Sequence, residues 1–568
     1  MNKTNITFVT AFMNIYETPF QNKDVEWRFR HFRKIAQLGI QITAFCSPDC
    51  KEVMESLTFE FPNVQVLEYI DLKDTWTYQT CTSIQDVELP NNRNIEKDTK
   101  EYIILMNTKT EFLKKAAEAD LWNSTHFAWI DFNIFHIFKT ESDEKYAGEL
   151  LTRLTKRSLR QTFLTMPGCW HKNHVVNEYL INDVCWRWCG GFFLGDKSSI
   201  INFHDMYELH LVEFLEKTKK IVWEVNFWAW LEKEYDMCII WYHGDHNISI
   251  LEIGGEVCSY EVPKIQSYRY DFEHLGDFRP TSMSYIKFKG EDVLNIRYVN
   301  YWLYPGGGYL IHHPERHIYT KNYFAFLEGP NGTMDNRGFL PICMNEMNED
   351  SITLENHGGS IYGLEDIRLY EYLDEICFIA TNINYSDVGR NRLIKGKYNI
   401  EERTYDNCSL LIPPDKDSWC EKNWIPIVKD QKEYFIYKWS PFEIGTISDT
   451  SNQLEICYQF NHRTPFFNRV RGSTPFIETD EGYLGLVHFS EEKHPRQYFH
   501  LLVLLDKTTF QPLRYSNHFF FNNVSIEFCI GFTIFEDKYY FWISNFDRDP
   551  ELVVVLKESI PLIFDFYE

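Results

Sequence analysis

The pattern of apolar residues changes near residue 260, and this change constrains the fold more than any other feature. Before it, short apolar runs alternate with helical stretches: strands are predicted at Ile6–Phe12, Gln41–Phe45, Val64–Tyr69 and Phe127–Ile130, and helices at Glu26–Leu38, Thr99–Glu118, His204–Lys219 and Asn226–Glu234. Such alternation predicts an α/β domain with a mostly parallel sheet. We expect its first strand, the strand before Asp131 and the segment Cys238–Tyr242 to lie side by side.

After residue 260, helical periodicity nearly disappears. The predicted strands are Ser282–Phe288, Val293–Tyr301, Gly308–His312, Ile376–Thr381, Tyr434–Tyr437, Gly482–His488, Phe499–Leu505 and Tyr539–Ser544. Many short strands separated by turn residues predict a sandwich, a barrel or a propeller. The predicted domains are therefore residues 1–255 and 269–568, joined by a linker at Glu256–Tyr268.

Charge and composition exclude several classes of function. The 568 residues include 57 Lys and Arg against 82 Asp and Glu, a net charge of −25 that repels nucleic acids and anionic membranes. No apolar run approaches the roughly 20 residues of a membrane helix, and the first residues lack the apolar core of a signal peptide. Fourteen cysteines without a CxxC pair indicate reduced thiols. We expect a soluble, cytoplasmic protein; the codon usage implied by its composition suits a large DNA virus or an AT-rich microbe.

The sharpest motif of the first half is Trp129-Ile130-Asp131-Phe132-Asn133, an apolar strand that ends in Asp-x-Asn. Alternate residues of a strand share a face, so Asp131 and Asn133 point the same way. Oxygen ligands at this spacing suit Mg²⁺ or Mn²⁺ bridging a diphosphate. The alternative is an ordinary turn, because Asp and Asn are common turn formers.

Three further features accompany this motif. Gly190 and Gly191 lie in a glycine-rich, strand-like stretch where a ligand can approach the backbone. Glu224 stands just before an apolar helix, and His243 follows the last predicted strand, where it is a candidate metal ligand or a structural histidine.

The segments Thr7–Phe12, Trp129–Asn133 and Gly190–Gly195 resemble the HtrL/YibB-like family, whose members are regarded as glycosyltransferases, over roughly residues 5–250. The resemblance implies a GT-A-like nucleotide-sugar fold. It also implies a metal at Asp131 and Asn133, Glu224 as the base that deprotonates the acceptor hydroxyl, and Gly190 and Gly191 beside donor sugar and acceptor. The implied partners are a nucleotide-sugar donor and a glycan or glycoprotein acceptor. Asn133 in place of a second Asp lowers the charge on the metal.

In the second half, Glu365, Asp366 and Arg368 stand out within Gly363-Leu364-Glu365-Asp366-Ile367-Arg368. A carboxyl beside a cation and a second acid is useful for protonating a glycosidic oxygen. The alternative is an exposed, salt-bridged loop. Other fragments place charged or amide groups beside strand ends, where a propeller would gather them at its centre: Asn295–Tyr301, Glu421–Pro426, Tyr437–Pro441, Arg471–Pro475, Leu486–His488 and Ile526–Gly531.

The order of these fragments resembles the β-mannoside phosphorylase and β-1,2-mannosyltransferase family over roughly residues 270–560. The resemblance implies a five-bladed propeller with Asp366 as general acid. It implies Arg368, Lys422, Arg471 and His488 as ligands of phosphate or a phosphorylated sugar, and Arg297, Asn300 and Asp547 as sugar contacts.

The combined prediction is an α/β GT-A-like nucleotide-sugar domain followed by an all-β five-bladed β-propeller. The function expected is bifunctional: a metal-dependent glycosyltransferase joined to a propeller that acts on β-mannoside-type glycans by transfer or phosphorolysis. One alternative is a single active transferase whose propeller only binds glycan, and another is a structural protein without activity. The oligomeric state, a homo-oligomer included, is left open.

Overall fold

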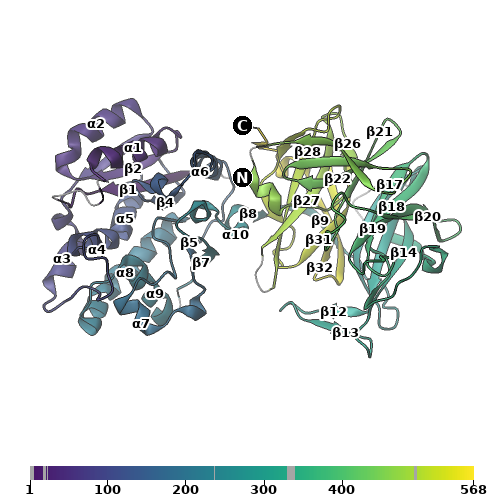
Figure 1. Ribbon diagram of the computed structural model, residues 1–568, viewed down its shortest axis with the longest axis horizontal. Coiled ribbons are helices and arrows are strands. Elements are labelled where there is room, and N and C mark those ends of the chain that lie inside the picture. Colours follow the sequence, from purple (N-terminus) through teal and green to yellow (C-terminus); the bar gives the residue numbers. More distant parts are fainter. Residues whose placement is uncertain are drawn as a thin grey trace. The chain divides into compact units, whose positions relative to one another are not determined.

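The computed structural model describes residues 5–16, 21, 23–235, 237–328, 340–462, 464–491 and 495–567. The chain divides into two compact units between Cys258 and Ser259 (Figure 1). The predicted linker Glu256–Tyr268 contains most of α10 (Gly255–Cys258), β8 (Ser259–Glu261) and most of β9 (Lys264–Arg269). In the part of the chain described here, no helix is long and apolar enough to cross a membrane.

The N-terminal unit is built on a seven-stranded sheet of order β3-β2-β1-β4-β6-β5-β7. Its strands are β1 (Ile6–Phe12), β2 (Ile42–Cys46), β3 (Val64–Tyr69), β4 (His126–Ile130), β5 (Leu164–Gly168), β6 (Phe192–Asp196) and β7 (Ile240–His243). Only β6 runs antiparallel to its neighbours. The expectation that β7 lies beside β4 is wrong, because β6 and β5 come between them. Pro167 and Gly168, which are unfavourable in strands, hid β5 from the sequence pattern.

Helices cover both faces of this sheet (Figure 1). They are α1 (Val25–Ala36), α2 (Lys51–Glu60), α3 (Trp76–Ser83), α4 (Lys100–Asn107), α5 (Lys109–Ala119), α6 (Glu141–Leu154), α7 (Asn177–Asn182), α8 (Lys197–Thr218) and α9 (Glu224–Tyr235). Phe8 packs with α1, α2 and α6, whereas Val9, on the opposite face of β1, packs with α5, α8 and α9. The helix predicted over Thr99–Glu118 is interrupted at Thr108, so Lys109 opens a new helix.

The C-terminal unit is a propeller-like array of mainly antiparallel sheets, in which only the β14–β16 and β30–β8 pairs among the described strands are parallel. Its remaining strands are β10 (Arg279–Phe288), β11 (Glu291–Val299), β12 (Tyr301–Leu303), β13 (Tyr309–Ile311), β14 (Ile318–Glu328), β15 (Leu340–Glu346), β16 (Ile361–Tyr362), β17 (Glu365–Tyr372), β18 (Glu375–Asn382), β19 (Arg392–Asn399), β20 (Thr404–Leu411), β21 (Ile425–Lys429), β22 (Lys432–Trp439), β23 (Phe442–Ile447), β24 (Leu454–Phe460), β25 (Arg471–Gly472), β26 (Ile477–Glu478), β27 (Tyr483–Glu491), β28 (Gln497–Leu505), β29 (Pro512–Tyr515), β30 (His518–Phe520), β31 (Glu527–Phe535), β32 (Lys538–Asn545), β33 (Asp549–Leu556) and β34 (Phe564–Asp565).

The prediction of five blades is wrong, because the propeller-like unit has four four-strand blades and one larger sheet. Four of them follow a four-strand path: β10-β11-β14-β15, β17-β18-β19-β20, β21-β22-β23-β24 and β31-β32-β33-β9. The remaining large sheet has eight strands, because β8, β26, β30 and β34 join the path β25-β27-β28-β29. In the last four-strand sheet, β9 pairs antiparallel with β33, with Arg269 opposite Glu551, so strands from the two ends of the unit lie in one sheet.

Candidate functional sites

A buried lysine is the centre of the first site. The Lys109 ammonium donates to the Gly190 carbonyl at 2.8 Å and to Glu224 Oε1 at 2.9 Å, and it lies 3.0 Å from Asp131 Oδ1. Burial alone would lower the pKa of Lys109, but the charges of Asp131 and Glu224 outweigh burial and raise it. Three acceptors around three ammonium protons satisfy this cation completely. The ammonium therefore ties the end of β4, the start of β6 and the start of α9 together.

The structure gives a physical reason for Gly190. A Cβ at this position would lie 2.2 Å from Glu224 Oε1, so only glycine lets the carboxylate reach Lys109. The next residue, Gly191, accepts a hydrogen bond from the Asp131 backbone N–H at 2.9 Å. Gly190 and Gly191 thus lie beside Asp131 and Glu224.

The oxygen atoms at the end of β4 partly fit a divalent cation. Asp131 Oδ1 accepts hydrogen bonds from Lys109 and, at 2.7 Å, from the Trp129 indole N–H. Asp131 Oδ2 and the Asn133 side-chain oxygen have no hydrogen-bond partner among the described residues, which leaves two oxygen ligands of the kind that Mg²⁺ and Mn²⁺ take. His243 lies exposed at the end of β7 with its ring edge-on to Trp241, and nothing described joins it to Asp131 or Asn133.

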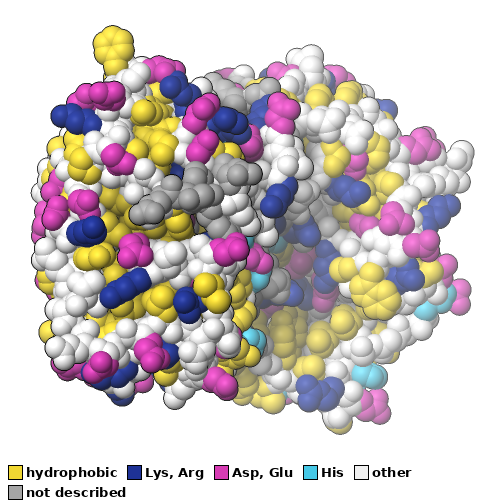
Figure 2. All heavy atoms as spheres, turned by 60° about the vertical axis from the view of Figure 1, so that its left-hand side comes forward, with side chains coloured by type: hydrophobic (Ala, Val, Ile, Leu, Met, Phe, Trp, Pro, Cys, Tyr) yellow, Lys and Arg dark blue, Asp and Glu magenta, His cyan; other side chains and the backbone are white. Residues whose placement is uncertain are grey.

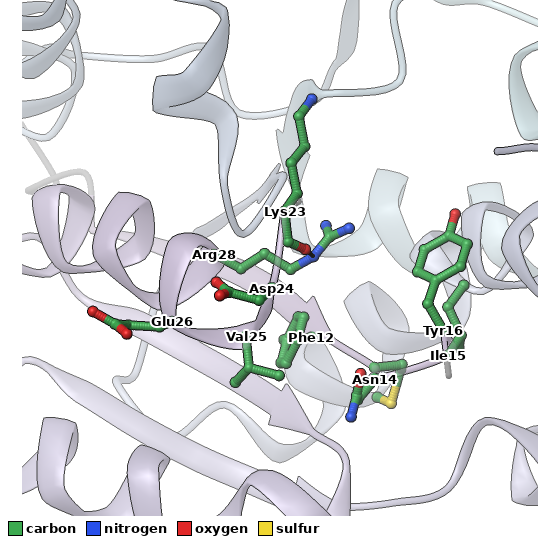
Figure 3. Close-up of a pocket in the computed structure, with 10 residues that line it drawn as sticks. Phe12, Asn14, Ile15, Tyr16, Lys23, Asp24, Val25, Glu26 and Arg28 are labelled. Carbon is green, nitrogen blue, oxygen red and sulfur yellow. Dashed lines mark hydrogen bonds between the residues drawn. The ribbon is translucent and has the colours of Figure 1, made fainter. Parts of the chain in front are cut away.

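A cleft of about 340 Å³ opens where β1 ends. It is lined by the end of β1 and the residues after it, from Phe12 to Tyr16, and, around the start of α1, by Lys23, Asp24, Val25, Glu26 and Arg28 (Figure 3). In this view the Arg28 side chain reaches from α1 toward Tyr16, whose ring centroid lies 6.0 Å from the guanidinium. Phe12 stacks on Phe132 with ring centroids 5.1 Å apart, so the cleft adjoins the Asp131 segment.

The charged residues of the cleft are the cations Lys23 and Arg28 and the carboxylates Asp24, which caps α1, and Glu26, which pairs with Arg30. Burial, followed by the charges of Arg28, Lys97 and Lys139, lowers the pKa of Lys23. Among the described residues, no carboxylate forms an ion pair with Lys23 or Arg28. On the face that Figure 2 presents, Lys and Arg side chains are likewise interspersed with Asp and Glu. Unpaired, mutually repelling cations at a cleft favour a bound anion.

The second site is a charged cluster that gathers residues from three sheets of the propeller. Arg297 of β11 donates to Asp366 Oδ1 and to Glu365 Oε1, both at 3.0 Å. Lys422, before β21, lies 3.3 Å from Glu365 Oε2. Burial raises the pKa of Glu365, but Arg297 and Lys422 outweigh it and hold this pKa below its usual value. Glu365 is therefore an ionised carboxylate at neutral pH.

Asp366 and Asp547 owe their positions to unusual backbone. Asp366 lies in a β-bulge at the start of β17 with a φ of 53°, and Asp547 lies in the turn after β32 with a φ of 49°. Such left-handed positions are uncommon outside glycine and often accompany functional sites. Burial raises the pKa of Asp547, Arg297 opposes this rise, and the Tyr301 hydroxyl donates to Asp547 Oδ2 at 3.1 Å. The cluster thus contains carboxyl groups whose pKa values are displaced in opposite directions.

The other predicted residues of the propeller are held by the protein itself. Arg368 is fully buried and donates to the Ser473 carbonyl at 2.6 Å and to the Asn423 side chain at 2.9 Å. Asn300 is also buried, and its amide bonds the backbone of two neighbouring residues, His317 and Tyr319.

The predicted phosphate ligands Arg471 and His488 differ in exposure. Arg471 is exposed and donates to the carbonyls of Asn468 and Val470. His488 bonds the Ser473 hydroxyl at 2.8 Å, and burial, with nearby positive charges, keeps the pKa of His488 well below its usual value. A neutral histidine attracts phosphate weakly.

Sequence reasoning missed Lys109 and Tyr301, and it noted Glu365 as part of an acidic pair without giving it a role. Lys109 belongs to no motif, and the only available signal was Thr108, a residue type that starts helices, inside an otherwise continuous helical pattern. Tyr301 stood at the end of a predicted strand, but its partner Asp547 is remote in sequence.

Comparison with known proteins finds similarities in both halves of the chain. Residues 4–221 match the sequence model of a family described as bacterial protein of unknown function (HtrL_YibB). Protein HtrL of Escherichia coli (strain K12) is 29% identical over 202 residues, covering 30% of this chain and 69% of that protein. A β-1,2-mannobiose phosphorylase from Listeria innocua has a TM-score of 0.35 and 13% identity, covering 52% of this chain and 98% of its own. A mannose phosphorylase from Leishmania mexicana has a TM-score of 0.33 and 12% identity, covering 54% of this chain and 93% of its own. The resemblance to the HtrL/YibB-like family is thereby confirmed over residues 4–221, and mannoside phosphorylases are among the solved structures to which the chain is similar.

Proposed function

We propose that the N-terminal unit is a GT-A-like glycosyltransferase that binds a nucleotide-sugar in the cleft beyond β1. The observation that carries this proposal is the cleft at the carboxyl end of β1, where Lys23 and Arg28 form no ion pair with any described residue. The chain leaves β1 for β2 on one side and returns to β4 on the other, and ligands of α/β sheets bind at such a reversal of strand order. Lys23 and Arg28 would neutralise the diphosphate.

The residues around Lys109 have distinct roles in this proposal. Asp131 and Asn133 would hold Mg²⁺ or Mn²⁺, which supplies charge neutralisation at the diphosphate when bound. Glu224 accepts the proton of the acceptor hydroxyl, and Lys109 fixes the Glu224 carboxylate beside Gly190. Loss of the Lys109 ammonium, or of the Gly190 carbonyl contact that holds it, would displace the Glu224 carboxylate but leave it present.

Calorimetric titration of nucleotide diphosphates and nucleotide sugars, with Mn²⁺ or with EDTA, tests the N-terminal proposal. A hydrogen bond to a charged group contributes about 1.5–3 kcal/mol, so Arg28→Ala should weaken binding by roughly 10- to 100-fold. Lys217→Ala, on the exposed side of α8, is the matched loss of one positive charge and should leave binding unchanged. Equal affinities for all three proteins, or no binding by wild type, would contradict the proposal.

We propose, second, that the propeller acts on a glycosidic bond at the Arg297 cluster. Asp547, with its raised pKa, retains a proton more readily than Glu365 and can donate it, while Asp366 lies against the same arginine. The Arg368 guanidinium already donates to the Ser473 carbonyl, and His488 is neutral, so both are weak ligands for phosphate. We therefore expect water or a sugar hydroxyl, rather than phosphate, to accept the transferred sugar.

An assay of β-mannoside release, with and without phosphate and GDP-mannose, tests the propeller proposal. Asp547→Asn and Asp366→Asn should each abolish turnover while the melting temperature stays close to wild type. The rival function, glycan binding without catalysis, predicts no turnover by wild type and unchanged glycan affinity in both variants. Product formation that depends on added phosphate would instead establish phosphorolysis.

A further inference from the structure

Two cysteines and a histidine meet in the N-terminal unit, apart from the Lys109 contacts. Cys169 directly follows β5, Cys189 precedes β6, and His246 follows β7. One ligand atom from each residue lies within 4.8 Å of the other two. Cys189 is buried, Cys169 is half-buried and His246 is exposed, so the group opens to solvent on the histidine side.

The distance between the two sulfur atoms fits a shared metal. The Sγ atoms of Cys169 and Cys189 lie 3.6 Å apart. A zinc ion with bonds of about 2.3 Å to sulfur in tetrahedral geometry sets its two sulfurs about 3.8 Å apart. A disulfide needs about 2.0 Å. The two thiols therefore stand at the separation of two corners of a zinc tetrahedron.

A neighbouring carboxylate orients the histidine. Asp245 Oδ1 lies 3.0 Å from His246 Nδ1 and also accepts the His246 backbone N–H at 2.6 Å. Histidines that bind metals usually donate their other ring N–H to a carboxylate in this manner. With Nδ1 engaged, Nε2 remains for a metal. The Trp186 ring packs edge-on against the imidazole at 4.5 Å between centroids and restricts its rotation.

The backbone holds the three loops close together independently of any ion. The Cys189 N–H donates to the Pro167 carbonyl at 2.8 Å, and the Gly244 N–H donates to the Gly168 carbonyl at 3.2 Å. The Cys189 thiol bonds the Gly244 carbonyl at 3.3 Å. A site assembled from such constrained loops is largely formed before a ligand arrives.

We propose that Cys169, Cys189 and His246 bind one zinc ion, with Asp245 as the orienting carboxylate and water in the fourth position. Two thiolates and an imidazole select zinc over Mg²⁺ and Mn²⁺. Because Cys189 adjoins Gly190, the ion would fix the backbone segment that carries the Lys109 contact. This proposal does not depend on the proposed transferase function.

Metal analysis of the full chain tests the zinc site. Protein purified under reducing conditions should carry one zinc per chain, and Co²⁺ replacement should give the thiolate-to-cobalt charge-transfer absorption of a tetrahedral site. His246→Ala, an exposed change that leaves the fold intact by circular dichroism, should lose the zinc. Asp245→Asn should weaken zinc binding by about 10- to 100-fold in competition with a chelator.

Cys238→Ser is the matched control, because Cys238 is an exposed cysteine two residues before β7. It should keep one zinc per chain. The proposal is overturned if wild type binds no zinc after incubation with it, if His246→Ala retains wild-type affinity, or if mass spectrometry shows a Cys169–Cys189 disulfide in the purified protein.

Discussion

Replacing Lys109 with methionine removes the only cation that the structure places between Asp131 and Glu224, within the described residues. Its side chain is 3% exposed, and that of Glu224 is 6% exposed. Methionine preserves length and apolar volume, so the change isolates the charge. The two carboxylates then face each other across Gly190 without compensation.

The expected cost follows from this burial. Breaking a buried ion pair by removing one partner costs about 3–5 kcal/mol. In a unit of this size, each kcal/mol corresponds to roughly 2–4 °C in melting temperature, so we expect a decrease of about 6–20 °C. Replacing both partners, as in Lys109→Met with Glu224→Gln, should recover part of this loss because one unpaired charge is removed.

Differential scanning calorimetry of the full chain measures the decrease, and hydrogen exchange in α5 and α9 assigns it to the N-terminal unit. Lys114→Met is the matched control on the same helix, since Lys114 pairs with the half-exposed Asp205. Such a pair contributes about 0–1 kcal/mol. If Lys109→Met lowers the melting temperature no more than Lys114→Met does, the ion pairs do not hold this site together.

The pH dependence gives a second check on the same variant. The pKa of Lys109 is raised in the folded protein, so its stabilisation is complete below the ordinary lysine pKa of about 10.4 and is lost as pH rises through the folded value. From neutral pH upward, the difference in stability between wild type and Lys109→Met should therefore persist until strongly alkaline solution. A difference that disappears at neutral pH would contradict the ion-pair explanation.

Three other predictions concern single sites. Gly190→Ala should lower the free energy of unfolding by about 1–3 kcal/mol, because the added Cβ overpacks against Glu224. Gly306→Ala is the control: a Cβ there meets nothing within 4 Å, so the free energy of unfolding should change by less than about 0.5 kcal/mol. Urea denaturation of both variants measures the difference. His500 is fully buried with no partner for either ring nitrogen among the described residues, and burial lowers its pKa to about 3, so acidification from pH 6.5 should destabilise wild type more than His500→Phe. Burial raises the pKa of Glu527 to about 8, so wild type should lose stability as the pH rises from 4.5 to 8. Urea titrations at several pH values should show a smaller loss for Glu527→Gln.

Local pattern predicted most elements of the fold. Ile6–Phe12 and Val64–Tyr69 are strands with the predicted bounds, because each is an apolar run closed by turn residues. The order of strands in the sheet was predicted less well, since β5 carries Pro167 and Gly168 and reads as a loop. Sequence also cannot show that one sheet of the propeller recruits four additional strands, because these pairings join remote segments.

The candidate sites divide along the same line. Motifs identified Asp131 and Asp366, because in both cases the polar residues that indicate a site are close together in the sequence. Lys109 remained hidden because its three acceptors come together only in the folded unit. Arg368 shows the opposite error: its residue type suggested phosphate binding, but tertiary packing places its guanidinium against the Ser473 carbonyl.

The pairing of β9 with β33 determines when the propeller can close during synthesis of the chain. Residues 264–269 leave the ribosome well before their partner, residues 551–555, has been made. The N-terminal unit can fold while translation continues, since domains generally fold as units in order of synthesis. The propeller, however, keeps the edge of β9 unpaired until β33 has been made. A nascent chain halted before residue 551 therefore exposes that edge.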